Sequence, residues 1–268
     1  MLYMLTSLLV LSLPSFASIE AIYGEDNRKE VYESSPFYQD LARSTAGMMS
    51  SFALSSKGDI LEITAPTLKY YASLCSSERF AEQMSASTCS GFLIGPDLLA
   101  TAGHCVNEIT CSSGRWVFDY KLEEGSDKIL VPRSNVYSCK KIMKDRDGLL
   151  ADAAIIQLDR PVTDRQPLVI SRKKARVGDE LVMIGHPSGL PSKVTDGATV
   201  NKRSLRKFKT NLDAFAGNSG SAVMNAQSGE VVGILVRGKE DYTSNGFCRT
   251  TTRHSGDGGE WVSDISQL

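Results

Sequence analysis

The stretch Gly217-Asn218-Ser219-Gly220-Ser221 places a serine between two glycines in what we predict to be a short loop. Glycine adopts backbone conformations that other residues avoid, so it permits a tight turn that directs a hydroxyl outward and gathers N–H groups at one point. This arrangement suits a nucleophile with an oxyanion pocket beside it. Ordinary turns show the same pattern, so the interpretation depends on whether the chain also supplies a base and a carboxylate.

The first partner for Ser219 is His104, in the stretch Thr101-Ala102-Gly103-His104-Cys105. Cys89 and Cys105 bracket a predicted hairpin that turns at Gly95-Pro96-Asp97. A disulfide between these cysteines would close a loop of about fifteen residues and contribute on the order of 3 kcal/mol. It would also hold His104 at the end of the hairpin. The alternative is a core histidine beside a disulfide.

The second partner is Asp152, which begins the otherwise apolar stretch Asp152-Ala153-Ala154-Ile155-Ile156-Gln157-Leu158. A carboxylate at the start of a buried strand is costly unless it is paired or hydrogen-bonded. An imidazole N–H is a suitable partner, and that bond would leave the other ring nitrogen free to accept the Ser219 proton. The alternative is that Asp152 only caps the start of a strand.

Short apolar segments separated by turn residues follow one another from Thr45 onward, roughly every 8–15 residues, which predicts antiparallel barrels or a sandwich. We divide this region into a first half, residues 46–162, and a second half, residues 163–268. Helices are expected only at Ser35–Ala42, with Pro36 in the first helical position, and over Tyr70–Met84.

The first seventeen residues differ from the rest of the chain. An uncharged apolar run, Leu2–Leu13, precedes Ser15-Phe16-Ala17, whose small residues predict signal-peptidase cleavage after Ala17. The run is short for a membrane span, but no Lys or Arg precedes it, so a lipid-facing anchor or a buried helix is the alternative. Residues 18–45 are expected to form an N-terminal arm or a propeptide.

The composition is that of an ordinary globular protein, with 41% hydrophobic and 23% charged residues and a net charge of −1. Such a charge gives no long-range attraction to nucleic acid or membranes. Six cysteines without a CxxC pair indicate an oxidising compartment and argue against a structural zinc site. The pairing cannot be fixed from the sequence; besides the hairpin pair, our hypothesis joins Cys111 to Cys139 and Cys75 to Cys248.

The three motifs containing His104, Asp152 and Ser219 occur in that order, and together they resemble the signatures of chymotrypsin-fold (trypsin-like) serine proteases. The resemblance covers about Thr88 to Gly238. It implies an all-β fold of two antiparallel six-stranded β-barrels with a short helix or two. It also implies that His104 is the general base, Asp152 orients it and Ser219 is the nucleophile, with the backbone N–H groups of Gly217 and Ser219 as the oxyanion hole.

The stretch Gly233–Gly238 resembles the strand along which such enzymes pair the substrate backbone. The implied substrate-binding residues there are Leu235, Val236, Arg237 and Gly238. One position departs from trypsin, where an Asp before the nucleophile accepts the amine that zymogen cleavage creates. Asn218 cannot form that ion pair, and the Asn-Ser-Gly-Ser version resembles the bacterial glutamyl endopeptidase and V8-like members instead.

The specificity pocket is the least determined feature. In glutamyl endopeptidases a His and a Thr line the pocket, and the matching positions here are Leu235 and Ala214, which offer a carboxylate no hydrogen bond. Asp213 matches the pocket-base aspartate of trypsin, where a buried carboxylate would select Arg or Lys. The alternative is that Asp213 caps the loop or faces solvent.

The sequence therefore predicts a secreted or periplasmic serine endopeptidase that acts through an acyl-enzyme and cleaves after Arg or Lys. We expect a protein or peptide substrate, a monomer, no nucleic-acid partner and no stable membrane insertion, and neither a cofactor nor a metal. The alternative is a non-catalytic binding or adhesion protein of the same fold, which the presence of all three triad residues disfavours.

Overall fold

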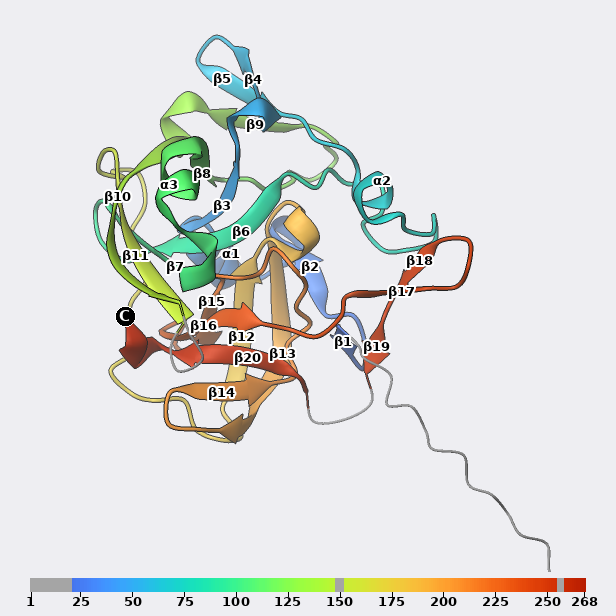
Figure 1. Ribbon diagram of the computed structural model, residues 1–268, viewed down its shortest axis with the longest axis vertical. Coiled ribbons are helices and arrows are strands. Elements are labelled where there is room, and N and C mark those ends of the chain that lie inside the picture. The colour runs from blue at the N-terminus through green and yellow to red at the C-terminus, as the bar shows by residue number, and fades with distance from the viewer. Residues whose placement is uncertain (1–20, 148–151, 255–257) are drawn as a thin grey trace, which may run out of the picture.

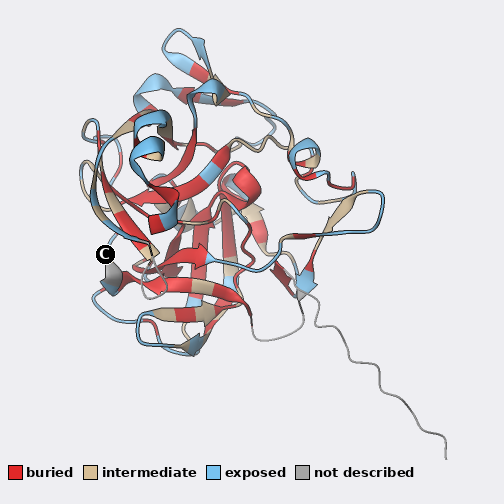
Figure 2. Cartoon of the chain, viewed as in Figure 1, coloured by how far each residue is buried: buried red, intermediate tan, exposed pale blue. Residues whose placement is uncertain are grey.

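The computed structural model describes residues 21–147, 152–254 and 258–268, and the export signal predicted at residues 1–17 lies outside them. Two β-barrels account for most of the described chain, one in the upper half and one in the lower half of the view in Figure 1. Buried residues concentrate in the strands of both barrels, whereas the outer hairpins are largely exposed (Figure 2). The predicted all-β fold with two antiparallel six-stranded barrels is confirmed.

The first barrel closes in the order β10-β11-β7-β6-β3-β8, and neighbouring strands are antiparallel throughout. Its interior is filled by large side chains such as Phe92, Trp116 and Phe118, all of which are buried. The strands are β3 (Thr45–Ser50), β6 (Ser87–Leu93), β7 (Leu98–Thr101), β8 (Gly114–Phe118), β10 (Val136–Asp147) and β11 (Asp152–Leu158).

The second barrel has the order β12-β15-β16-β20-β14-β13 and closes through the pairing of β12 with β13. One continuous cluster of buried side chains runs from Phe92 in the first barrel to Val182 and Ile184 in the second, so the two barrels share a core and hold each other in place. The strands are β12 (Glu180–Gly185), β13 (Lys193–Arg203), β14 (Lys207–Thr210), β15 (Ala222–Asn225), β16 (Val231–Arg237) and β20 (Glu260–Asp264).

Smaller elements surround the barrels. A three-stranded sheet consists of β4 (Leu54–Lys57), β5 (Ile60–Ile63) and β9 (Ile129–Pro132); β17 (Tyr242–Ser244) pairs with β18 (Arg249–Thr251), and β1 (Ile22–Tyr23) with β19 (Arg253–His254). The α-helices are α1 (Pro36–Ala42), α2 (Leu68–Ala72) and α3 (Glu108–Ser113). Short 3₁₀ helices span Val31–Glu33, Ser51–Ala53, Gly103–Cys105, Arg133–Asn135, Pro187–Gly189 and Ile265–Gln267. Among the described residues, no helix is long and apolar enough to cross a membrane.

The helices test two local predictions. The helix predicted from Pro36 is confirmed, and the Ser35 hydroxyl accepts a hydrogen bond from the backbone N–H of Tyr38 (3.4 Å) at its start. The helix predicted over Tyr70–Met84 is wrong for most of its length. Helix α2 ends at Ala72, and the next residue, Ser73, has a left-handed φ of 55°. The chain then continues as turns past Cys75, which is bonded to the distant Cys248.

All six cysteines form disulfides, in the pairs Cys89–Cys105, Cys111–Cys139 and Cys75–Cys248. Each predicted pair is confirmed. The first lies within the first barrel beneath His104, and the second joins α3 to β10. The third joins the segment after α2 to the start of β18 and thus ties an insertion of the first half to a hairpin of the second.

Part of the N-terminal segment, residues 18–45, adds to the second barrel. Strand β2 (Arg28–Glu30) adds to the edge of β13. Glu30 forms an ion pair with the buried Lys193 (2.8 Å), and Gln83 bonds to both partners (2.8 and 2.9 Å). Burial lowers the pKa of Lys193 to about 8, and the neighbouring Glu30 opposes that shift. This buried network holds Arg28–Glu30 against the edge of the second barrel.

Breaking this pair should be far more costly than breaking the exposed pair beside it. Glu30→Gln leaves the buried Lys193 ammonium without a counter-charge and should lower the free energy of unfolding by about 3 kcal/mol. Lys29→Gln removes the half-exposed pair with Asp196 (2.9 Å) on the same strand and should cost less than about 1 kcal/mol. Urea unfolding curves of the two variants measure the difference, and equal losses would contradict a structural role for the buried pair.

Candidate active site

Ser219 lies in a tight loop just before β15. The loop is held by hydrogen bonds from Asn218 N–H to Phe215 O (3.0 Å) and from Gly220 N–H to Leu235 O of β16 (2.8 Å). Gly217 and Gly220 both have φ of 90°, in the left-handed region that favours glycine. The glycines on both sides of Ser219 are therefore needed for this backbone, as the sequence predicted.

His104 lies in the 3₁₀ helix Gly103–Cys105 at the end of β7, and Asp152 is the first residue of the neighbouring strand β11. The two side chains meet: His104 Nδ1 lies 2.8 Å from Asp152 Oδ2, and the His104 backbone N–H donates to Asp152 Oδ1 (3.3 Å). Burial acts to raise the pKa of Asp152, but the bonds from the ring and backbone of His104 outweigh it and hold the pKa below its usual value. The carboxylate is thus ionised at neutral pH and orients the ring.

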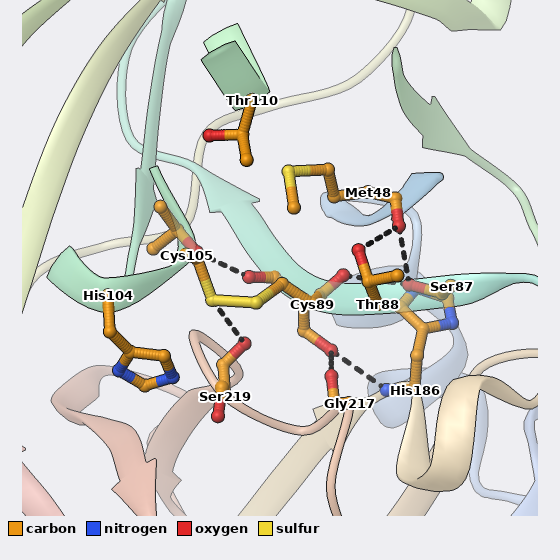
Figure 3. Close-up of a disulfide and its surroundings, with 12 residues drawn as sticks. Met48, Ser87, Thr88, Cys89, His104, Cys105, Thr110, His186, Gly217 and Ser219 are labelled. Atoms are coloured by element: carbon orange, nitrogen blue, oxygen red, sulfur yellow. Dashed lines mark hydrogen bonds between the residues drawn. A yellow bond between two sulfur atoms is a disulfide. The ribbon is translucent and has the colours of Figure 1, made fainter. Parts of the chain in front are cut away.

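The disulfide Cys89–Cys105 lies against the serine loop next to His104. Cys105 Sγ lies 3.6 Å from the Ser219 carbonyl oxygen. Figure 3 shows the imidazole of His104 and Ser219 on the same side of this disulfide. The structure therefore brings all three predicted triad residues together at the contact between the two barrels. The two cysteines are oxidised, so they supply no thiolate that could join His104 in a metal site.

The backbone amides of Gly217 and Ser219 are available for a ligand. Within the described chain neither N–H group donates to a protein acceptor, whereas the carbonyl groups of the same two peptide units are engaged: Ala216 O accepts from Ser188 N–H (2.5 Å) and Asn218 O from Ser221 N–H (2.8 Å). Fixing the carbonyls fixes the adjoining peptide planes. The amides flanking Asn218 can thus act as a preorganised pair of donors.

Comparison with known proteins places these motifs in one family. Residues 89–234, which contain His104, Asp152 and Ser219, match the model of the trypsin-like peptidase domain. The chain belongs to the trypsin-like peptidase domain family.

The relatives of this trypsin-like peptidase domain include two bacterial proteins. The Haemophilus influenzae protein named "Probable periplasmic serine protease do/HhoA-like" is 31% identical over 137 residues, 47% of this chain and 28% of that protein. The Escherichia coli "Periplasmic pH-dependent serine endoprotease DegQ" is 34% identical over 92 residues, 31% of this chain and 20% of that protein. The chain therefore spans less than a third of the length of either relative.

Solved structures show the same fold. The active form of the Rv3671c protease from M. tuberculosis superimposes with a TM-score of 0.51 at 15% identity, over 96% of this chain and 90% of that chain. A Glu endopeptidase is also among the structural neighbours, with a TM-score of 0.48 at 18% identity, over 82% of this chain and 91% of that chain. At such identities the likeness concerns the fold and not the specificity.

The structure places Asp213 against the N-terminal arm of the peptidase domain. Its side chain accepts hydrogen bonds from the backbone N–H groups of Tyr23 and Asn27 (2.8 Å each), and the residue is only 1% exposed. Burial raises the pKa of Asp213 to about 6, although the two N–H groups act in the opposite direction. Asp213 thus anchors the arm to the segment that leads into the Ser219 loop.

The four predicted substrate-binding residues lie on β16 and directly after it. Leu235 and Val236 are buried in two different hydrophobic clusters, on opposite faces of the strand, whereas Arg237 and Gly238 are exposed. The pairing of β16 with β15 ends at Ile234. Beyond Leu235, which is still bonded to the serine loop, the β15-facing edge of β16 is therefore open to an extended peptide.

Sequence reasoning missed a second buried carboxyl group beside Gly238. A Cβ atom at Gly238 would lie 2.4 Å from Oε2 of Glu260. Glu260 is buried, its Oε1 accepts from the Tyr23 hydroxyl (3.3 Å), and its Oε2 has no hydrogen-bond partner among the described residues. Burial raises the pKa of Glu260 well above its usual value. The stretch Gly258-Gly259-Glu260 carries no local signal that could have revealed this contact.

The raised pKa of Asp213 predicts a pH dependence of stability. The folded chain binds this proton at about pH 6 and the unfolded chain at about 3.8. The contribution of Asp213 is therefore fully present below about pH 4 and is lost as the pH rises through 6, a change of about 3 kcal/mol. Asp213→Asn removes this titration. The stability difference between wild type and Asp213→Asn should shift by up to that amount between pH 4 and pH 7, and parallel curves from chemical denaturation would contradict the assignment.

Proposed function

We propose that this chain is a serine endopeptidase that is secreted or periplasmic and hydrolyses peptide bonds through an acyl-enzyme. The observation that carries the proposal is the bond between His104 and Asp152, formed beside a serine loop with two unused backbone N–H groups. The periplasmic proteases among the relatives support the location.

Each residue of the candidate active site has its own role in the proposed reaction. Ser219 Oγ attacks the scissile carbonyl carbon while His104 Nε2 takes the hydroxyl proton, and Asp152 holds the ring and stabilises the imidazolium. The N–H groups of Gly217 and Ser219 bind the oxyanion, and each donor contributes roughly 3–4 kcal/mol. His104 then gives its proton to the leaving amine, and the acyl-enzyme is hydrolysed by a water that the same imidazole activates.

The substrate is proposed to bind as an extended strand along the open edge of Val236–Gly238, with Arg or Lys preceding the scissile bond. Asp213 and Glu260 both contact Tyr23, and the Glu260 carboxyl group lies directly behind Gly238. Buried carboxyl groups with raised pKa values gain most from a cation, because a positive charge stabilises the ionised form that burial disfavours.

The nucleophile is tested with a fluorophosphonate probe, which labels only an activated serine. Wild type should be labelled, and Ser219→Ala should not. Ser228→Ala removes a hydroxyl from an exposed turn of the same barrel and should be labelled like wild type. Equal labelling of wild type and Ser219→Ala, or none of wild type, would contradict the assignment, and the latter result would favour the non-catalytic alternative.

The preference for Arg or Lys is tested with peptides that differ only at the residue before the scissile bond. Glu260→Gln preserves the size of the side chain but removes its charge, and it should lower kcat/KM for Arg and Lys peptides about tenfold or more relative to a Leu peptide. Asp213→Asn, measured in parallel, shows whether the arm-anchoring carboxyl contributes as well. If the ratio of kcat/KM for the Arg peptide to kcat/KM for the Leu peptide is unchanged in both variants, the proposal that buried carboxyl groups select Arg or Lys is refuted.

A further inference from the structure

A hollow of about 420 Å³ opens directly beside the oxyanion loop. Ala216 and Gly217 of that loop form one wall, and Thr88, the neighbour of Cys89, belongs to another. Helix α2 closes a third side with Tyr71 and Ala72. The cavity is thus continuous with the proposed catalytic centre, yet it takes no part in the chemistry described above.

The position of the hollow relative to β16 decides which part of a peptide it can meet. No residue of β16 lines it, and its other walls come from α2, the start of β6, the 3₁₀ helix Pro187–Gly189 and the hairpin β17–β18 with Asp241 before it. The acyl portion of the substrate is proposed to bind along Val236–Gly238. A peptide that passes the nucleophile therefore carries its leaving portion past Gly217 toward the hollow.

The walls are fixed in place before any ligand binds. The disulfide Cys75–Cys248 joins the segment after α2 to the β17–β18 hairpin, and the Cys75 N–H donates to Arg249 O (3.0 Å). Asp241, at the start of the hairpin, accepts from the Ala216 N–H (2.9 Å). A cavity held by covalent and backbone bonds costs little to organise on binding, so more of the contact energy appears as affinity.

The chemistry of the lining indicates what the hollow accepts. Its two charged residues, Asp241 and Arg249, have opposite signs, so the lining carries no net charge. The α2 wall is apolar or aromatic, formed by Leu68, Tyr71 and Ala72. The Tyr71 side chain is 72% exposed, which leaves its ring free to cover an incoming group. A large uncharged side chain gains most from such a site.

We propose that this hollow binds an aromatic or large aliphatic side chain from the first two residues after the scissile bond and thereby sets a leaving-group preference. The proposal rests on the peptidase function proposed above. It assigns a role to the insertion that contains α2 and to the disulfide Cys75–Cys248, which holds that insertion against the second half of the chain.

The chain offers a matched control for the test. Tyr70 and Tyr71 are adjacent on α2 and are 80% and 72% exposed, but only Tyr71 lines the hollow. Internally quenched peptides with one acyl portion would carry Phe, Leu, Glu or Gly at each of the two positions after the scissile bond. Tyr71→Ala should lower kcat/KM for the Phe and Leu peptides about tenfold and hardly change it for the Gly peptide, while Tyr70→Ala should behave like wild type.

A second variant fills the cavity instead of removing part of its wall. Thr88→Trp, at an exposed residue of the lining, places an indole in the hollow and should abolish the preference for Phe and Leu over Gly. Fluorophosphonate labelling of each variant reports the catalytic centre alone, because the probe has no peptide leaving group. Labelled wild-type enzyme with no preference among the four peptides would overturn the subsite and leave the peptidase function intact. Equal losses in Tyr70→Ala and Tyr71→Ala would also overturn it, and absence of labelling in wild type would contradict both proposals.

Discussion

One buried serine, Ser90 of β6, connects the two barrels at the active site. It is 0% exposed. Its N–H donates to Ser219 O (2.8 Å), its hydroxyl donates to Gly217 O (2.8 Å) and accepts from His186 N–H (3.0 Å), and its carbonyl accepts from Thr101 Oγ1 (2.7 Å). The nucleophile loop, the end of β12 and the strand leading to His104 are thus attached to a single residue. Each of these groups is buried, so an unmade bond would cost about 1–3 kcal/mol.

The serine loop packs so closely against its neighbours that Gly217 and Gly220 have no room for a side chain. A Cβ atom at Gly220 would lie 2.0 Å from Ser90 O, and one at Gly217 would lie 2.6 Å from His186 O. Both distances are too short for any side chain. Gly220 is therefore a packing requirement of the contact between the barrels, and Gly217 is one of the packing of the serine loop against the turn at His186–Gly189 within the second half of the chain. The same contact holds the loop on both sides of Asn218, because Ser90 binds the carbonyl groups of Gly217 and Ser219.

The features that the sequence predicted are those with a local or ordered signature. The glycines around Ser219, the hairpin cysteines beside His104 and the carboxylate that opens an apolar strand each constrain a few neighbouring residues. The features that the sequence could not show depend on contacts between residues that are far apart in the chain. In the sequence, Ser90 is an ordinary polar residue beside a cysteine. No residue near Asp213 indicates that the backbone of Tyr23 will bind the Asp213 side chain. Side-chain periodicity reports which face of an element is buried, but not which distant segment covers it.

The arm contact bears on how the serine loop is kept in order. In the trypsin pattern a carboxylate next to the nucleophile accepts a new terminal amine, and Asn218 lacks the charge for that bond. Here the backbone of Tyr23 and Asn27 binds Asp213, and the Arg28 guanidinium stacks 4.1 Å from the ring of Phe215. Both contacts lie just before the oxyanion loop, and both use internal peptide groups or a side chain. In the described chain these contacts hold the segment that leads into the oxyanion loop against residues 23–28.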